Sequence, residues 1–251
     1  MTSALDPLPI AITALTFLLA GFVKGVIGLG LPTVAMGLLS LVMAPAQAAA
    51  LLIVPSFVTN VWQLAAGPRF GTLAHRLWPM MVGVVVGTLA GAGFLQGSHA
   101  GQAAIALGLA LMAYAVLGLT AVRFALPPEA QGGWMGPLIG ALTGLVTAAT
   151  GVFVIPAVPY LGALGLAKDE LIQALGLSFT VSTLALAAVL AGSGVFEPGT
   201  AGASAFALGP ALVGMAMGGW VRGRVSEPVF RRCFFLGLLA LGTHLASRAL
   251  L

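Results

Sequence analysis

The stretch Gly21-Phe-Val-Lys-Gly-Val-Ile-Gly-Leu-Gly-Leu-Pro32 lies inside an apolar segment that is too long to form one plain transmembrane helix. That segment covers residues 8–44, whereas about 20 helical residues cross a bilayer. Glycine costs about 1 kcal/mol and proline about 3 kcal/mol in a helix interior, so Gly28, Gly30 and Pro32 predict a break. We therefore expect one helix that enters the membrane and a shorter helix that returns from the break.

A second version of this stretch, Gly140-Ala-Leu-Thr-Gly-Leu-Val-Thr-Ala-Ala-Thr-Gly151, lies in the apolar segment 135–166. The two align without a gap, with Gly21 on Gly140 and Lys24 on Thr143. The second segment should also break and return. We expect the short returning helices to begin near Leu31–Val34 and near Gly151–Phe153.

The rest of the chain also divides into two matching sets of apolar segments. Gly83 and Gly87 lie over Gly214 and Gly218 when the halves are aligned, and a polar break at 127–133 separates the halves. The other apolar segments are 48–66, 77–95, 102–123, 171–192, 203–221 and 230–250. Weak identity with a conserved order of segments is typical of an internal structural repeat. We expect a first transmembrane repeat at 1–126 and a second at 134–251 within one integral-membrane domain.

The composition fixes the broad class of protein. Hydrophobic residues make up 60% of the chain and charged residues only 6%, whereas a soluble domain is about 25% charged. The fold class is therefore an all-α polytopic membrane protein. The net charge of +4 comes from short loops, which indicates membrane orientation and not nucleic-acid binding. One cysteine excludes an internal disulfide and a cysteine zinc site.

The basic residues predict how the two halves are oriented. If each long segment enters and returns, eight basic residues fall on one side of the membrane and Arg248 on the other, with Lys24 inside a segment. The eight are Arg69, Arg76, Arg123, Lys168, Arg222, Arg224, Arg231 and Arg232. Cytoplasmic loops carry the Lys/Arg excess. This topology makes the second repeat inverted relative to the first and places both termini on the non-cytoplasmic side.

The distribution of charge favours an anionic substrate. All six acidic residues lie in termini or loops, whereas cation-coupled carriers often use carboxylates within the membrane. Lys24 is the ionisable residue inside a segment, and Thr33, Thr147 and Thr150 are hydroxyl donors beside the breaks. Inverted-repeat transporters aim half-helix N-termini at anions from such breaks. The alternative is that Lys24 extends to the interface and that the small residues serve close packing.

A second polar set lies on the segments that follow the breaks. Ser56, Thr59, Asn60 and Gln63 have the i, i+3, i+4, i+7 spacing of one helix face, which lipid would disfavour. A similar set recurs in the second half as Ser178, Thr180, Ser182 and Thr183. These faces should point inward, either to line a path or to form interhelical hydrogen bonds worth about 0.6 kcal/mol each. The residues offer no motif of an enzyme active site, and we expect no catalytic activity and no cofactor.

These motifs resemble the sulfite exporter TauE/SafE family of membrane permeases. The resemblance rests on Gly21-x-x-x-Gly25-x-x-Gly28-x-Gly30, on Gly140-x-x-x-Gly144 through Gly151 to Pro156, and on the turn Arg69-Phe-Gly71. It covers essentially the whole chain. In place of the family's Gly-Ile-Gly-Gly-Gly run, this chain has Gly28-Leu-Gly-Leu-Pro32. This difference concerns which substrate is bound and not the architecture. The resemblance implies transport of small sulfur-containing anions, such as sulfite, sulfonates or sulfoacetate, across a bacterial inner membrane.

Together these observations predict a secondary transporter that works by alternating access in the lipid bilayer. The alternatives are a non-transporting membrane scaffold and an anion channel, and homo-oligomerisation stays open. The substrate-binding residues that we expect are Lys24, Gly28, Gly30, Thr33, Ser56, Asn60, Thr147, Thr150, Gly151, Ser178 and Ser182.

Overall fold

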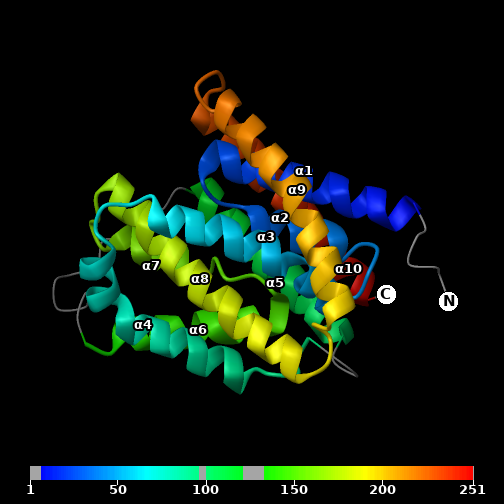
Figure 1. Ribbon diagram of the computed structural model, residues 1–251, viewed down its shortest axis with the longest axis horizontal. Helices are drawn as coiled ribbons and strands as arrows, with labels where there is room; N and C mark the ends of the chain where they lie inside the picture. The colour runs from blue at the N-terminus through cyan, green and yellow to red at the C-terminus, as the bar shows by residue number, and fades with distance from the viewer. Residues whose placement is uncertain (1–6, 96–99, 121–132, 251) are drawn as a thin grey trace.

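The structure is a computed structural model that describes residues 7–95, 100–120 and 133–250, and these residues form helices and connecting turns without strands (Figure 1). Most of the polar break at 127–133 lies outside the described residues, as do Asp6, His99, Arg123 and Glu129. The helices of the first half are α1 (Pro7–Ile27), α2 (Leu31–Leu39), α3 (Pro45–Ala65), α4 (Phe70–Ala90) and α5 (Ala100–Thr120). Those of the second half are α6 (Met135–Thr150), α7 (Ala157–Ala163), α8 (Lys168–Gly192), α9 (Pro198–Val221) and α10 (Glu227–Leu250). The predicted all-helical fold is confirmed.

Each half begins with a long helix, a break and a short helix, as the sequence predicts. In the first half the chain turns at Gly28 and Gly30, whose φ angles of 77° and 105° favour glycine, and α2 starts at Leu31 as expected. The expected start of α7 near Gly151–Phe153 is wrong. This helix begins at Ala157, after an irregular link whose last residue is Pro156. Proline disfavours the helical conformation in the residue before it, so the helix starts after the proline.

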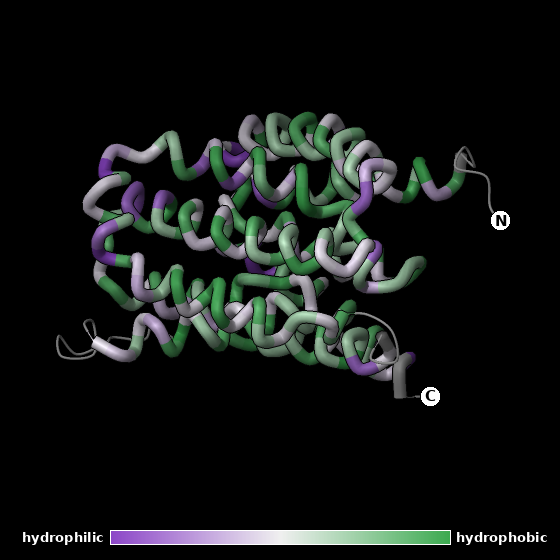
Figure 2. Tube along the Cα trace, turned by 60° about the horizontal axis from the view of Figure 1, so that its bottom comes forward, coloured by the Kyte–Doolittle hydropathy of each residue, from purple (hydrophilic) through white to green (hydrophobic). Residues whose placement is uncertain are grey.

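Seven helices of the described chain are long and apolar enough to cross a membrane, and α6 is a shorter apolar helix. Figure 2 shows hydrophobic residues along the lengths of the helices and hydrophilic residues mostly towards the helix ends. Helices α3, α4, α5, α8, α9 and α10 begin before the corresponding apolar segments of the sequence. For example, α4 begins at Phe70 and not at 77, so His75 and Arg76 lie in its first turns and not in a loop.

The first helix of the chain packs against α9 of the other half (Figure 1). A Cβ atom at Gly21 would overlap the carbonyl oxygen of Ala211, and one at Gly25 would overlap the carbonyl oxygen of Met215. Small residues allow helix backbones to approach this closely in membranes. The residue numbers rise together on both helices, so α1 and α9 run parallel.

The same contact recurs between α6 and α4 with the two halves exchanged. Gly140 lies against the carbonyl oxygen of Met80, and Gly144 lies against that of Val84. These glycines are the ones that align with Gly21 and Gly25. The sequence repeat is therefore also a repeat of packing, in which the halves interlock and do not form separate bodies.

Two further pairs of corresponding helices, α3 with α8 and α5 with α10, pack against each other and run in opposite directions. α3 crosses α8 near the centre of the molecule (Figure 1), where Ser56 approaches Thr183 and Leu64 approaches Gly176. Helices α5 and α10 also run antiparallel. Corresponding helices of opposite direction are the feature that an inverted repeat requires. The inverted orientation in the membrane and the division at 127–133 stay predictions.

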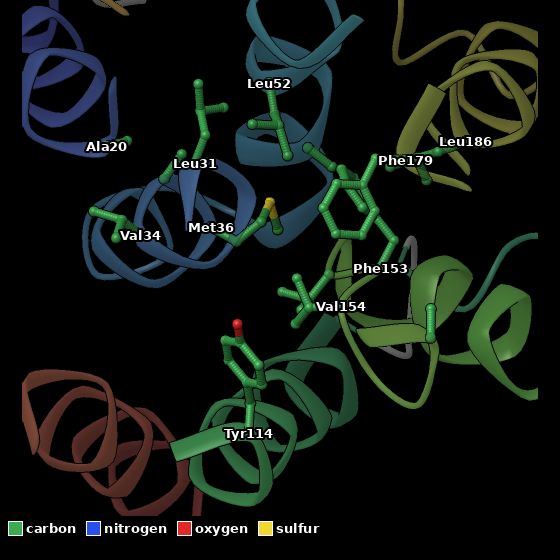
Figure 3. Packing of buried hydrophobic residues seen from close by; sticks show 14 of the residues in the cluster. Ala20, Leu31, Val34, Met36, Leu52, Tyr114, Phe153, Val154, Phe179 and Leu186 are labelled. Carbon is green, nitrogen blue, oxygen red and sulfur yellow. The ribbon is translucent and has the colours of Figure 1, made fainter. Parts of the chain in front are cut away.

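The short helix that follows the first break meets the second break in the buried core (Figure 3). Met36 of α2 lies against Gly151 at the end of α6, and Phe153 packs on Phe179 of α8 with ring centroids 5.2 Å apart. Residues 152–154 of the link are fully buried. Irregular backbone is tolerated at membrane depth where protein surrounds it, and the packing at this point provides that surrounding.

Candidate functional site

Lys24 lies in the last turn of α1 and points into the protein. Its side chain is only 5% exposed, and its Nζ atom donates hydrogen bonds to Thr59 Oγ1 at 3.0 Å and to Asn60 Oδ1 at 2.5 Å. Both acceptors belong to α3. An ammonium group has three N–H donors, and these two bonds leave one donor for another acceptor. The side chain thus lies at α3 in the interior and does not extend to the surface.

No carboxylate accompanies this ammonium group among the described residues. The described acidic residues, Asp169, Glu170, Glu197 and Glu227, all lie at or just before helix starts. An ion pair joins Arg69 to Glu170 at 3.2 Å, at the start of α8. A buried cation at membrane depth is costly unless it is paired. The Lys24 ammonium is held by neutral oxygens alone, so its environment suits an anionic partner.

The polar face predicted on α3 is buried and connects Lys24 to the second half. Asn60 accepts from Lys24 through Oδ1 and donates from Nδ2 to Ser56 Oγ at 3.1 Å. Ser56 Oγ in turn lies 3.3 Å from the Thr183 hydroxyl of α8. Thr59 donates to the carbonyl oxygen of Pro55 at 2.7 Å while it accepts from Lys24. A continuous polar chain therefore runs from α1 through α3 to α8.

Pro55 shapes this face, because a proline inside a helix has no N–H for the carbonyl four residues before it. Ser204 of α9 supplies the missing donor. Its hydroxyl donates to the carbonyl oxygen of Leu51 at 2.8 Å and accepts from the N–H of Val54 at 3.0 Å. Ser204 is fully buried. Ser204 of α9 thus completes the backbone hydrogen bonding of α3 in the turn that precedes Ser56.

The second half contributes hydroxyl groups in place of a charge. Thr143, Thr147 and Thr150 are buried, and each donates to a carbonyl oxygen one turn earlier on α6, at 2.6–2.7 Å. The Oγ atoms of Ser178 and Ser182 on α8 are fully buried and have no hydrogen-bond partner. An unpaired buried hydroxyl costs about 1–3 kcal/mol. Packing alone therefore does not explain why two serines lie at these buried positions.

The glycines and Thr33 of the expected site belong to the breaks themselves. Thr33 is fully buried and donates to the carbonyl oxygen of Gly30 at 2.9 Å, which stabilises the first turn of α2. Gly151 has a φ of 70° and ends α6. The structure thus joins Lys24 to Asn60 and Asn60 to Ser56, and places the other expected residues on the breaks, on the first turn of α2, on the last turn of α6 and on α8.

Sequence reasoning missed two residues that hold the site together. Gln173 of α8 donates to the carbonyl oxygens of Leu64 and Gly67 at 2.9 and 2.8 Å, and accepts from the N–H of Arg69 at 2.9 Å. Ser204 is the other. A glutamine in the first turns of a helix and a serine among apolar residues carry no distinguishing pattern. Their roles depend on the backbone groups that they bond, which lie between α3 and α4 for Gln173 and beside Pro55 for Ser204.

The site is closed in this structure. Thr33, Ser56, Asn60, Thr147, Ser178 and Ser182 are fully buried. Three surface hollows of about 450–540 Å³ lie at helix ends, and none of them is lined by an expected site residue. No group of three or more His, Cys, Asp or Glu residues that could bind a metal ion occurs in the part of the chain that the structure describes. A ligand would reach the site only after helices move.

Comparison with known proteins gives one match. The family model of the sulfite exporter TauE/SafE matches residues 13–245. No curated protein and no solved structure matches the chain. The matched residues include both breaks, the polar faces of α3 and α8, and the four glycines of the helix crossings.

Proposed function

The chain belongs to the sulfite exporter TauE/SafE family, and from this premise we propose that it transports a small sulfur-containing anion across the bacterial inner membrane by alternating access. Sulfite, sulfonates and sulfoacetate are the candidate substrates. The family is one of membrane transporters, and seven helices of the described chain are long and apolar enough to cross a membrane. The sulfur-containing anion as substrate and alternating access as mechanism are what we propose.

The observation that carries the proposal is the buried ammonium group of Lys24, with its two neutral acceptors and no carboxylate beside it. A small anion placed next to Nζ would accept the third N–H and neutralise a buried charge that has no carboxylate beside it. Hydrogen bonds to a charged group are worth about 1.5–3 kcal/mol. The anion and Lys24 would thus stabilise each other inside the protein.

The other expected residues would complete the binding site. Gly28, Gly30 and Thr33 would contribute from the first break, and Ser56 and Asn60 from α3. From the second half we propose Thr147, Thr150, Gly151, Ser178 and Ser182. The unpartnered hydroxyls of Ser178 and Ser182 are donors that oxyanion oxygens accept.

Opposite directions of corresponding helices support alternating access. If α3 and α8, which cross at the site, are related by a two-fold axis in the membrane plane, the same motion of either half opens the site to opposite sides. The basic residues support this orientation. Arg222, the residue after α9, lies near the end of α1, where it donates to the carbonyl oxygen of Val26. Arg69 pairs with Glu170 at the start of α8. We propose that these ends face the cytoplasm and that both termini lie on the other side.

Transport assays test the proposal directly. Purified protein in proteoliposomes should take up radiolabelled sulfite or a small sulfonate at a saturable rate of a carrier, well below channel flux. An unlabelled substrate should compete, and chloride should not. If no sulfur oxyanion among sulfite, sulfonates and sulfoacetate is taken up, the proposed substrate class is wrong. Flux that does not saturate would favour an anion channel instead.

Thiol labelling separates a transporter from a scaffold. Thr33→Cys and Thr150→Cys would be made in a Cys233→Ser background, because Cys233 is exposed and would react itself. In a transporter these buried positions become accessible to a membrane-impermeant thiol reagent in one of its open states, and substrate changes the rate. In a scaffold both positions stay sealed with and without substrate.

A further inference from the structure

An exposed cation lies over the first break, in addition to the buried one. Arg222 follows α9, and its Nε atom donates to the carbonyl oxygen of Val26 in the last turn of α1 at 2.7 Å. A Cβ atom added to Gly28 would lie 3.5 Å from the Nη2 atom of Arg222. The guanidinium group therefore covers the turn at which the chain leaves α1.

Most of the donors of this guanidinium group are unused. A guanidinium group has five N–H donors, and the bond to Val26 takes the one on Nε. Among the described residues, no acceptor bonds to the Nη atoms and no carboxylate forms an ion pair with Arg222. The residue is exposed. The N–H donors on its two Nη atoms are thus available to a ligand that arrives from water.

Arg224, two residues further on, is held differently. Its guanidinium carbon lies 3.6 Å from the centroid of the Trp220 ring, and its Nη1 atom donates to the carbonyl oxygen of Trp220 at 2.6 Å. These contacts hold the side chain on the end of α9. The two arginines therefore have the same charge at the same end of the protein, and Arg222 is the one placed over the break.

Arg222 and Lys24 are two cations at the same end of α1. The N–H of Gly28 donates to the carbonyl oxygen of Lys24 at 2.8 Å, so the turn under Arg222 is one helical turn, about 6 Å, from Lys24 along the helix axis. Arg222 is exposed, whereas Lys24 is only 5% exposed. One cation thus faces the surface, and the other lies in the interior one turn away.

The second break has neither cation. Thr143 aligns with Lys24, and Gly91 aligns with Arg222. Gly91 borders a hollow of about 540 Å³ that Ala149 of α6 also lines. Where the Arg222 side chain covers the end of α1, the end of α6 therefore borders an open space. Because α6 packs on α4 as α1 packs on α9, the repeated packing does not require such an arginine.

We propose that Arg222 forms an entrance subsite for an oxyanion over the first break, from which the anion passes to Lys24. The planar guanidinium group presents parallel N–H bonds, which match two oxygen atoms of a sulfite or sulfonate group. Chloride has a single centre and lacks this match. The exposed positive charge also attracts anions from solution. Passage of the anion to Lys24 rests on the proposed function, whereas binding of the anion at Arg222 does not.

The stoichiometry of sulfite binding to the purified protein tests the subsite. The wild-type protein should bind two sulfite ions per chain, one at each cation. The ion at the exposed Arg222 should bind weakly, with a Kd on the order of 1 mM. Methanesulfonate should displace this ion, and chloride at equal ionic strength should not.

Substitutions at the two arginines assign the weak binding. Arg222→Gln removes the charge and keeps an amide donor for the Val26 carbonyl, and it should abolish the weak binding and leave the Kd of the other ion unchanged. Arg224→Gln is the matched control, because it removes the same charge at the same end, and it should keep both ions bound. Arg222→Lys keeps the charge but not the paired donors, so the weak Kd should rise about tenfold.

Transport distinguishes an entrance subsite from a residue that only holds the end of α1. In proteoliposomes, Arg222→Gln should lower kcat/KM for sulfite about tenfold through KM, and kcat/KM should depend less on ionic strength than in the wild-type protein. A residue that only compensated the carboxyl end of α1 would lower the melting temperature or kcat instead. Arg224→Gln should resemble the wild-type protein in both measurements.

The inference is overturned if the wild-type protein shows no weak binding of sulfite, if Arg222→Gln keeps this binding, or if Arg224→Gln loses it equally. Sulfite uptake without binding that depends on Arg222 would remove the entrance subsite and leave the transporter. Binding that depends on Arg222, without uptake of any sulfur anion, would remove the proposed function and leave the subsite.

Discussion

Replacing Lys24 by methionine is the most informative change for the proposed anion site. Methionine keeps most of the length of the side chain and removes the charge and all three N–H donors. If Nζ donates one hydrogen bond to the bound anion, the loss is that of a bond between charged groups, about 1.5–3 kcal/mol. Since 1.4 kcal/mol corresponds to a factor of ten, the Kd for the anion should rise by about 10- to 150-fold.

The stability of the Lys24→Met protein should change little, because two effects oppose each other. Removing a buried ammonium group that no carboxylate neutralises is favourable. The Oδ1 atom of Asn60 then loses its donor, at a cost of about 1–3 kcal/mol, whereas Thr59 keeps its bond to the Pro55 carbonyl. We expect a melting temperature within a few degrees of that of the wild-type protein. Lys24→Ala should weaken anion binding similarly, with a greater loss of packing.

The assay is equilibrium binding of radiolabelled sulfite to purified protein, with the melting temperature measured on the same preparations. Lys168→Met is the matched control, because Lys168 is exposed at the start of α8, and its Kd should equal that of the wild-type protein. A Lys24→Met protein that is folded and binds sulfite with the wild-type Kd would remove Lys24 from the site. A protein that is lost from the membrane would instead assign Lys24 to structure, and the reasoning on opposing costs would be wrong.

Three further substitutions test the architecture through the melting temperature of the purified protein. Ser204→Ala leaves the Leu51 carbonyl without the donor that Pro55 cannot provide, and should destabilise the protein by about 1–3 kcal/mol. Ser247→Ala at an exposed position should be neutral, and equal melting temperatures would contradict the role of Ser204. Gly140→Ala places a Cβ against backbone of α4 and should separate the helices, with a large loss of stability, whereas Gly209→Ala on the outer face of α9 should be tolerated. Gly30→Ala forces a non-glycine residue to a φ of 105° and should lower stability by about 1–3 kcal/mol; a neutral effect would mean that the break is not held in this conformation.

Sequence reasoning could locate the breaks because glycine and proline act locally. Gly28, Gly30 and Pro32 disfavour a helix whatever surrounds them, and α1 and α2 end and begin beside them. The start of α7 was harder to predict. Gly151 ends α6 as expected, but the position at which a helix resumes depends on how residues 152–154 pack in the core and on Pro156.

The candidate site could be predicted in its residues but not in its pairings. The low charge of the segment identifies Lys24 as unusual, and the spacing of Ser56, Asn60 and Gln63 indicates a buried face. That Lys24 contacts Asn60 depends on where the fold places α1 relative to α3, which no local pattern encodes. The unpartnered state of Ser182 is a property of the folded interior alone.

The crossing of α1 on α9 has a consequence for how the protein is made. About 190 residues separate Gly21 from its neighbour Ala211, which ribosomes synthesise in about 10–40 s at about 5–20 residues per second. During this interval the glycine face of α1 has no α9 to pack against. A chain that ends after α8 would leave this face of α1 without the helix that covers it, so such a fragment should be less stable than the full chain.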